Sequence, residues 1–194
     1  MRKFNQESFD YDLDKGTILN SPRFNKFEFK TAEIPPDIKK TIISYVENFQ
    51  DNFLNGIGLY FYSNSPGSGK TTILALVLKN IMLKGYRAYC DSLVEIKSKL
   101  KKEFDTNEVK LVEFMKNVDV LAIDDIGSEV MSNWLDEVFK ELLDHRYNKQ
   151  KPTLFTSNSQ IDFLPFAARS KDRLKEISLL IKFPEKSLRK PPII

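Results

Sequence analysis

The sequence predicts a three-layer α/β/α fold around a mostly parallel, five-stranded sheet. Three observations carry this prediction: short apolar runs alternate with helical patterns, a glycine-rich turn joins one such run to a helix, and two aspartates end a later run. Strands that alternate with helices form parallel sheets, whose ligands bind at the carboxyl ends of the strands. At 194 residues, the chain has room for one domain of this kind with a substantial core.

The chain is expected to divide into an extended N-terminal entry segment, residues 1–33, and a main domain, residues 34–194. The entry segment is spotted with aromatic residues but has no sustained period. Pro35 and Pro36 then mark the start of a helix. Its apolar face is formed by Ile38, Ile42, Ile43, Val46 and Phe49. The first strand, residues 58–62, follows this helix and leads into the glycine-rich turn.

The elements after the glycine-rich turn continue the alternation of strands and helices. Gly85 marks the end of the helix that leaves the turn. Further strands are expected at residues 86–90, 118–123, 153–156 and 177–183. Further helices are expected at residues 92–104, from Thr106 onward, at residues 134–146 and from Pro165 onward.

The glycine-rich turn, residues 63–72, is the most informative motif. It fits the phosphate-binding pattern G-x-x-x-x-G-K-[ST] except at Asn64, and Asn is the residue after Gly that best tolerates left-handed backbone angles. Backbone N–H groups of such a turn, with the positive end of the following helix, bind phosphate. The expected nucleotide-binding residues are Pro66, Gly67, Ser68, Gly69, Lys70, Thr71 and Thr72. Lys70 would reach the β- and γ-phosphates of ATP or ADP, and Thr71 would bind Mg²⁺.

Polar residues at the ends of two later strands predict the second half of an ATP site. Asp124 is expected to hold Mg²⁺ and Asp125 to orient or polarise the attacking water, because phosphoryl transfer depends on placing metal and nucleophile. Asn158, after the next strand, suits water positioning or γ-phosphate sensing. Arg169 and Arg173 lie four residues apart on a predicted helix. There they either stabilise negative charge in the transition state or form surface ion pairs.

Composition limits the cellular compartment, the metal sites and the binding partners to be expected. Cys90 and His145 are the only cysteine and histidine, so an intrachain disulfide is impossible and a zinc cluster is not expected. The sequence has no signal-peptide pattern and no apolar run approaching 18 residues, which favours a reducing cytoplasm and no membrane contact. A net charge of +3 does not demand nucleic acid. Two interpretations remain for a local group of lysines: it binds the phosphates of single-stranded DNA, or it forms a solvated helix face. The group consists of Lys97, Lys99, Lys101 and Lys102.

With these motifs in order, the chain resembles the AAA+ ATPase domain of bacterial helicase loaders of the DnaC/DnaI type, on the DnaI side. The resemblance is most specific at residues 123–134 and 152–158, and it assigns residues 34–194 to the AAA+ domain. It implies delivery of the replicative DNA helicase to single-stranded DNA during initiation of replication, with self-association into a ring or filament. It also implies Arg173 as the arginine finger, Arg169 as its competitor, and Arg189 at the sensor 2 position.

Departures from the family pattern keep other functions open. Most AAA+ proteins carry Glu where this chain has Asp125, which implies slow, switch-like turnover stimulated by assembly or single-stranded DNA. Such loaders also carry an N-terminal helicase-binding domain, so the resemblance implies either a short phage-like or mobile-element version or an ATPase fragment. The alternatives are a nucleotide-responsive adaptor or inhibitor of a helicase or loader, and an IstB-type transposition ATPase that acts with a transposase on duplex DNA.

Overall fold

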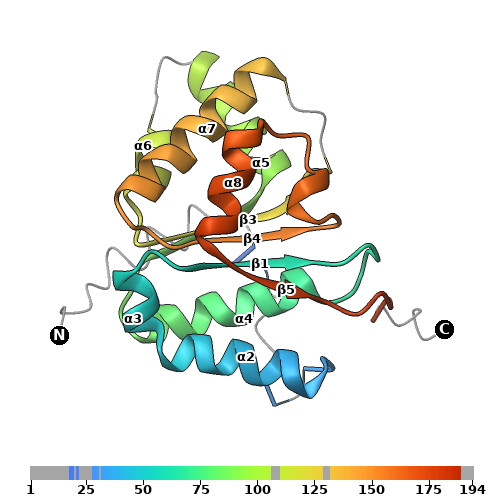
Figure 1. Cartoon of the computed structure of the whole chain (residues 1–194). Helices are drawn as coiled ribbons and strands as arrows, with labels where there is room; N and C mark the ends of the chain where they lie inside the picture. The colour runs from blue at the N-terminus through green and yellow to red at the C-terminus, as the bar shows by residue number, and fades with distance from the viewer. Residues whose placement is uncertain are drawn as a thin grey trace.

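A computed structural model describes residues 18–19, 21, 28–30, 32–105, 110–128 and 132–188. It confirms the three-layer fold: a five-stranded sheet lies between two layers of helices (Figure 1). Most of the entry segment lies outside the described residues, so its extended form stays a prediction. Arg189 and the expected helix start at Thr106 and Val109 also lie outside them.

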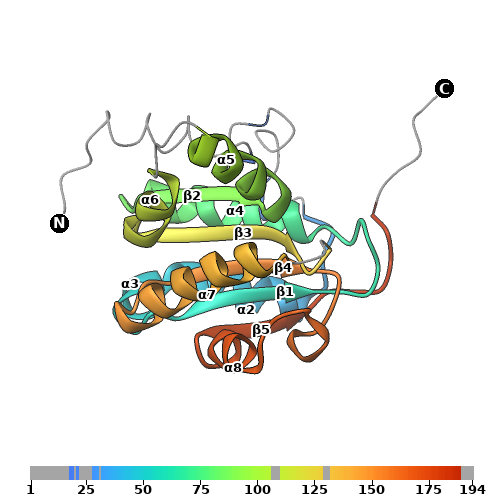
Figure 2. The ribbon, with the colours of Figure 1, turned by 90° about the horizontal axis from the view of Figure 1, so that it is seen from above.

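The sheet is parallel at every pairing, in the order β2-β3-β4-β1-β5. Its strands are β1 (Gly58–Tyr62), β2 (Ala88–Ser92), β3 (Val120–Ile126), β4 (Thr153–Ser157) and β5 (Ser178–Lys182). Because the strands run the same way, the loops that follow β1, β3 and β4 meet at one edge of the sheet (Figure 2). The three central strands therefore deliver the predicted site residues to a common place.

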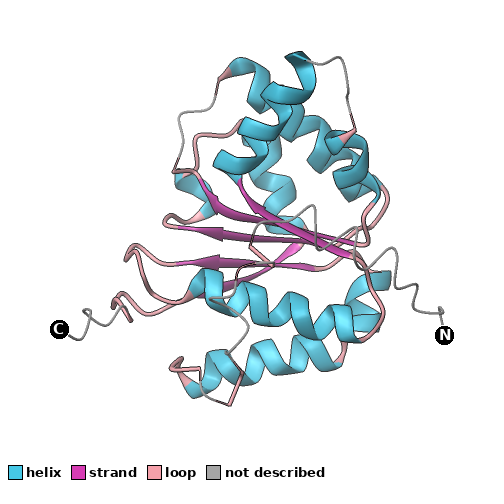
Figure 3. Cartoon of the chain, turned by 180° about the vertical axis from the view of Figure 1, so that it is seen from behind, coloured by secondary structure: helices cyan, strands magenta, loops and turns pink. Residues whose placement is uncertain are grey.

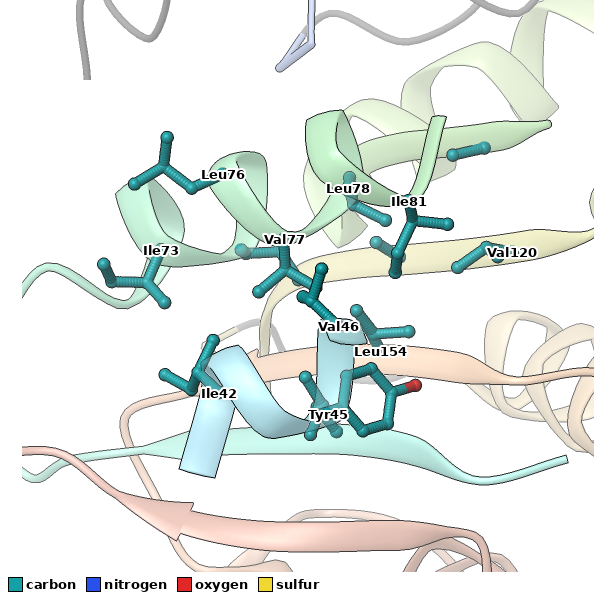
Figure 4. Packing of buried hydrophobic residues seen from close by; sticks show 14 of the residues in the cluster. Ile42, Tyr45, Val46, Ile73, Leu76, Val77, Leu78, Ile81, Val120 and Leu154 are labelled. Atoms are coloured by element: carbon teal, nitrogen blue, oxygen red, sulfur yellow. The ribbon is translucent and has the colours of Figure 1, made fainter. Parts of the chain in front are cut away.

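The two faces of the sheet are covered by different helices. One face carries α2 (Pro36–Glu47), α3 (Phe49–Leu54) and α4 (Lys70–Leu83), and the other carries α5 (Leu93–Asp105), α6 (Leu111–Asn117), α7 (Asn133–Asn148) and α8 (Ala168–Glu176). Between the sheet and α2, α4 is buried over most of its surface, and its Val77 and Ile81 face Val46 and Leu154 (Figure 4). None of the helices among the described residues is both long and apolar enough to cross a membrane.

Helix boundaries differ from the prediction mainly at two places. The helix predicted after Pro35 is interrupted at Asn48, whose side-chain Nδ2 donates to the Ser44 carbonyl, so α2 and α3 are separate. The short helix expected from Pro165 begins instead at Ala168, because Ala167 is still extended. A 3-10 turn, η2 (Ile161–Phe163), occupies the preceding stretch.

Strand boundaries also differ from the prediction, most of all at β2 and β3. β2 begins at Ala88, since the Arg87 N–H donates to the Asp119 carboxylate at 3.0 Å and not to the sheet. β3 does not stop before the aspartates but continues to Ile126 after a shift in register. Asp125 takes a positive φ of 54° at this irregularity, which lets Ile126 pair again with β4.

A fully buried arginine joins the helices α6 and α7 to the sheet. Arg146 of α7 is 0% exposed, and its guanidinium donates to the carbonyls of Met115, Val118 and Pro152 at 2.8–2.9 Å. Its Nε donates to Thr153 Oγ1 at 2.9 Å. These oxygens lie at the end of α6 and the starts of β3 and β4, so one side chain ties four elements together.

Replacing Arg146 by Ala is expected to lower the free energy of unfolding by about 3–5 kcal/mol, because several buried carbonyls lose their donor together. Urea denaturation measures this change. Lys140→Ala, on the exposed face of the same helix, is the matched control and should change stability by less than about 0.5 kcal/mol. A loss below about 1 kcal/mol for the Arg146 variant would contradict this role.

Candidate nucleotide site

The turn between β1 and α4 has the geometry of an anion site. Gly67 and Gly69 have φ values of 79° and 91°, which L side chains rarely adopt. α4 begins at Lys70, directly after the turn, so its free first-turn N–H groups and the positive end of its dipole face the turn. The turn and the helix together supply donors for a phosphate group.

Lys70 is a buried cation with neutral partners. It is 7% exposed, and its Nζ donates to Asn158 Oδ1 at 3.0 Å, Ser68 Oγ at 3.1 Å and the Ser65 carbonyl at 3.3 Å. Burial lowers the pKa of Lys70, while Asp125 and Asp124 oppose this shift. Among the described residues, no carboxylate lies within ion-pair distance of this ammonium. A phosphate would therefore give a buried charge its missing counter-charge.

Asp124 and Thr71 form the pair expected for Mg²⁺. Thr71 Oγ1 donates to the two carboxylate oxygens of Asp124 at 2.9 and 3.0 Å, and Thr156 Oγ1 donates to Oδ1 at 2.6 Å. Burial raises the pKa of Asp124, and the hydrogen bonds from Thr156 and Thr71 oppose this. The described residues hold no group of three metal-ligating His, Cys, Asp or Glu side chains. Mg²⁺ on this pair would thus complete its shell with phosphate oxygens and water.

Asp125 and Asn158 extend the same network. Asn158 Nδ2 donates to Asp125 Oδ1 at 2.9 Å, so one amide contacts both Lys70 and Asp125. The Asp125 N–H donates to Thr156 Oγ1 at 2.8 Å. Thr156 was not among the predicted site residues, although it stands two places before Asn158. Its hydroxyl touches both aspartate residues and fixes their relative positions.

The structure does not bring the predicted arginines to this network. Arg173 of α8 forms an ion pair with Asp144 of α7, and its guanidinium lies 5.2 Å from the centre of the Tyr147 ring. Its side chain is 12% exposed. Arg169 is 65% exposed and lies 3.7 Å from the same Asp144 carboxylate. Within one chain, both arginines therefore belong to the α7–α8 contact.

The lysine group that follows β2 is only partly available for a ligand. Lys99 Nζ lies 2.5 Å from the buried Asp91 carboxylate and 5.6 Å from the centre of the Tyr89 ring, so this lysine is engaged within the fold. Lys101 is exposed. One turn further on, Phe104 is 47% exposed and packs edge-on against Trp134 at a centroid distance of 5.2 Å. This aromatic pair was not predicted from the sequence.

Comparison with known proteins supports a nucleotide-binding fold. The family model described as IstB-like ATP binding protein matches residues 8–168. The chain is 29% identical over 144 residues to the replicative helicase loader DnaC of Escherichia coli strain K12, and 31% identical over 169 residues to the replicative helicase loader DnaI of Bacillus subtilis strain 168. A crystal structure of the DnaC helicase loader superimposes with a TM-score of 0.72 at 27% identity, covering 84% of this chain and all of that one.

The matches cover most of this chain but only part of the relatives. The DnaC alignment covers 73% of this chain and 59% of DnaC, and the DnaI alignment covers 84% of this chain and 53% of DnaI. The chain thus spans a little over half the length of the curated relatives it matches. The comparison accordingly supports the nucleotide-binding fold more directly than the activity of a whole loader.

Asp124→Asn is expected to stabilise the nucleotide-free protein at pH 7 and to abolish the rise in melting temperature caused by Mg²⁺ and ATP. A carboxyl whose pKa is raised by folding adds stability below its unfolded pKa, about 3.9, and loses it as the pH rises. The advantage of the variant should therefore shrink as the pH falls toward about 4.

Thermal unfolding between pH 4 and 8, with and without Mg²⁺ and ATP, checks this expectation. Asp172→Asn, which removes an exposed carboxylate from α8, controls for the change in net charge. A variant at Asp124 that is less stable than the parent at pH 7, or that keeps its response to Mg²⁺ and ATP, would refute it.

Proposed function

Because the chain belongs to the IstB-like ATP-binding family, we propose that it is an ATP-dependent loader of the replicative DNA helicase. The observation that carries the proposal is the network that joins Lys70, Asn158 and Asp125 beside the Thr71–Asp124 pair. This arrangement supports a site that binds phosphate, holds Mg²⁺ and positions a water, and it leaves the positive charge of an arginine to be supplied from elsewhere. The helicase itself is inferred from relatives named replicative helicase loaders, which the chain matches over most of its length.

Each residue of the network has a task in the proposed hydrolysis. The turn and Lys70 bind the β- and γ-phosphates, while Thr71 and Asp124 hold Mg²⁺, which would balance phosphate charge. Asp125 accepts a hydrogen bond from the water that attacks the γ-phosphate. Asn158 contacts Asp125 and Lys70 together, so it can report the presence of a γ-phosphate to the residue that orients the water. Asp is one methylene shorter than Glu, which suits slow turnover.

Hydrolysis also needs positive charge opposite the phosphate loop, and we place its source on a neighbouring copy. The resemblance to helicase loaders favours Arg173, which Asp144 holds in a fixed place on α8. Arg169, more exposed on the same helix, is the competing candidate. A finger supplied in trans makes hydrolysis depend on assembly into a ring or filament.

Single-stranded DNA is proposed to bind along α5. The exposed Phe104 and the partly buried Trp134 form an aromatic pair on which bases can stack, and Lys101 lies one turn away on the same helix for the phosphates. At its other end, α5 begins beside Asp124, since Ser92 pairs with Asp124 in the sheet. DNA on this helix would therefore act on the magnesium-binding strand through a single element.

We assign the protein to the cytoplasm, where the replicative helicase acts. The direct test is a pull-down of the replicative helicase with this chain in the presence of ATP or ADP. Retention of the helicase should differ clearly between ATP and ADP, and Lys70→Ala should remove that difference because it cannot hold the phosphates. Equal ATP turnover by the parent and the Lys70→Ala variant would favour the nucleotide-responsive adaptor, and equal capture with both nucleotides would contradict nucleotide-dependent loading.

Mixing two inactive variants tests the finger. Lys70→Ala keeps its arginines and Arg173→Ala keeps its phosphate loop, so a mixture should recover about a quarter of the parent ATPase rate through mixed contacts. Arg169→Ala in the same assay is the matched control on the same helix and should need no partner. Recovery seen with Arg169→Ala and not with Arg173→Ala would transfer the role to Arg169.

Phe104→Ala and Trp134→Ala are each expected to weaken binding of single-stranded DNA about tenfold, since a stacked base contributes ~1–3 kcal/mol. Lys101→Glu should also lower the salt dependence of binding. Fluorescence anisotropy measures both effects. Phe163→Ala, which removes a 76% exposed ring from η2, is the control.

The same assay separates the second candidate function. The family description names IstB, and an IstB-type transposition ATPase would act on duplex DNA. A clear preference for duplex over single-stranded DNA, with no effect of the Phe104 and Trp134 variants, would favour that reading over helicase loading.

A further inference from the structure

Asn64 stands where the phosphate-loop pattern has its first glycine, and the backbone does not explain it. In the described part of the chain, the residues other than glycine with a positive φ are Asp125 and Gln150. Asn64 is not among them, so the expected tolerance of left-handed angles is not used. Instead its side-chain Nδ2 donates to Glu185 Oε1 at 3.0 Å, across 121 residues of sequence.

Glu185 belongs to a segment, residues 183–188, that follows β5 and runs beside the phosphate loop (Figures 2 and 3). The segment is tied to the loop and its strand by three further hydrogen bonds: Phe183 N–H to the Tyr62 carbonyl at 2.7 Å, Ser63 Oγ to the Pro184 carbonyl at 3.0 Å, and Leu188 N–H to the Gly67 carbonyl at 2.9 Å. The contacts therefore run the length of the segment and reach the glycines that would hold phosphate.

The end of the segment closes over the glycine loop. A Cβ at Gly69 would come within 3.2 Å of Leu188 Cδ1, so the leucine side chain lies against this glycine. Of the four hydrogen bonds, Asn64 to Glu185 is the one between two side chains. Lys182 Nζ shares the same Glu185 oxygen at 3.2 Å and balances its charge. This contact can be broken without removing a backbone group.

We propose that Asn64 and Glu185 form a latch that holds residues 183–188 against the phosphate loop and slows the release of nucleotide. The inference rests on the proposed binding of ATP at this loop. In it, the pair acts by positioning the segment, and nucleotide leaves after the segment has lifted. The latch explains why Asn64 stands in place of the consensus glycine, because glycine has no side chain that could reach Glu185.

Exchanging the two side-chain chemistries separates the latch from a simple effect of charge. Asn64→Asp sets two carboxylates against each other, whereas Glu185→Gln keeps an oxygen that accepts from Asn64. The double variant, Asn64→Asp with Glu185→Gln, restores a donor facing an acceptor and keeps the parent net charge. Repulsion between Asp at position 64 and phosphate alone would not be relieved in the double variant. Asn148→Asp, at the far end of α7, controls for added charge.

Two readouts are needed. Stopped-flow release of a fluorescent ATP analogue should be about fivefold faster for Asn64→Asp, which corresponds to ~1 kcal/mol, and near the parent rate for Glu185→Gln and the double variant. Asn64→Gly should also release faster, although it restores the consensus pattern. Hydrogen exchange at the Leu188 amide, followed without nucleotide, should rise in the same variants and return in the double variant.

Equal exchange at Leu188 and equal release in all variants would overturn the latch. Faster release in Asn64→Asp that persists in the double variant would also overturn it, in favour of phosphate repulsion. Failure of the parent chain to bind the analogue would count against the proposed function, while exchange at Leu188 would still decide whether the latch exists.

Discussion

The buried ammonium group of Lys70 is the constraint on which the rest of the site depends. Because it is removed from water, it donates hydrogen bonds to oxygens of Ser65, Ser68 and Asn158. Asn158 can reach it because β4 pairs with β1 in parallel, with Ser157 beside Tyr62, so the two strands end together. The same amide then contacts Asp125, which links the charge on the phosphate loop to the residue proposed to orient water.

The site favours ligand binding over the stability of the empty protein. Asp124 is buried with a raised pKa, and Lys70 is buried with a lowered pKa, so both charges are disfavoured by their surroundings. Neither is paired with the other by a hydrogen bond among the described residues. A phosphate and Mg²⁺ supply the missing opposite charges, which is how binding energy would be coupled to the state of the network.

Local patterns predicted the fold well, and long-range contacts explain most of what they missed. β1 was predicted at its observed bounds, and the sheet and site edge followed from the alternation of elements. The register shift at Asp125 was missed because it depends on Thr156 of the neighbouring strand. The Asn64–Glu185 and Phe104–Trp134 contacts join residues far apart in sequence, so no local period could reveal them. Thr156 alone had a local signal, its place two residues before Asn158.

A crystal structure of the chain with a non-hydrolysable ATP analogue and Mg²⁺ tests the central claim most directly. The account predicts that Lys70 Nζ leaves Asn158 for the β- and γ-phosphate oxygens and that Mg²⁺ lies between Thr71 and Asp124. It further predicts that Asn158 keeps its hydrogen bond to Asp125 while its side-chain amide lies close to the γ-phosphate. An intact Lys70–Asn158 hydrogen bond with nucleotide bound elsewhere, or with no metal between Thr71 and Asp124, would contradict it.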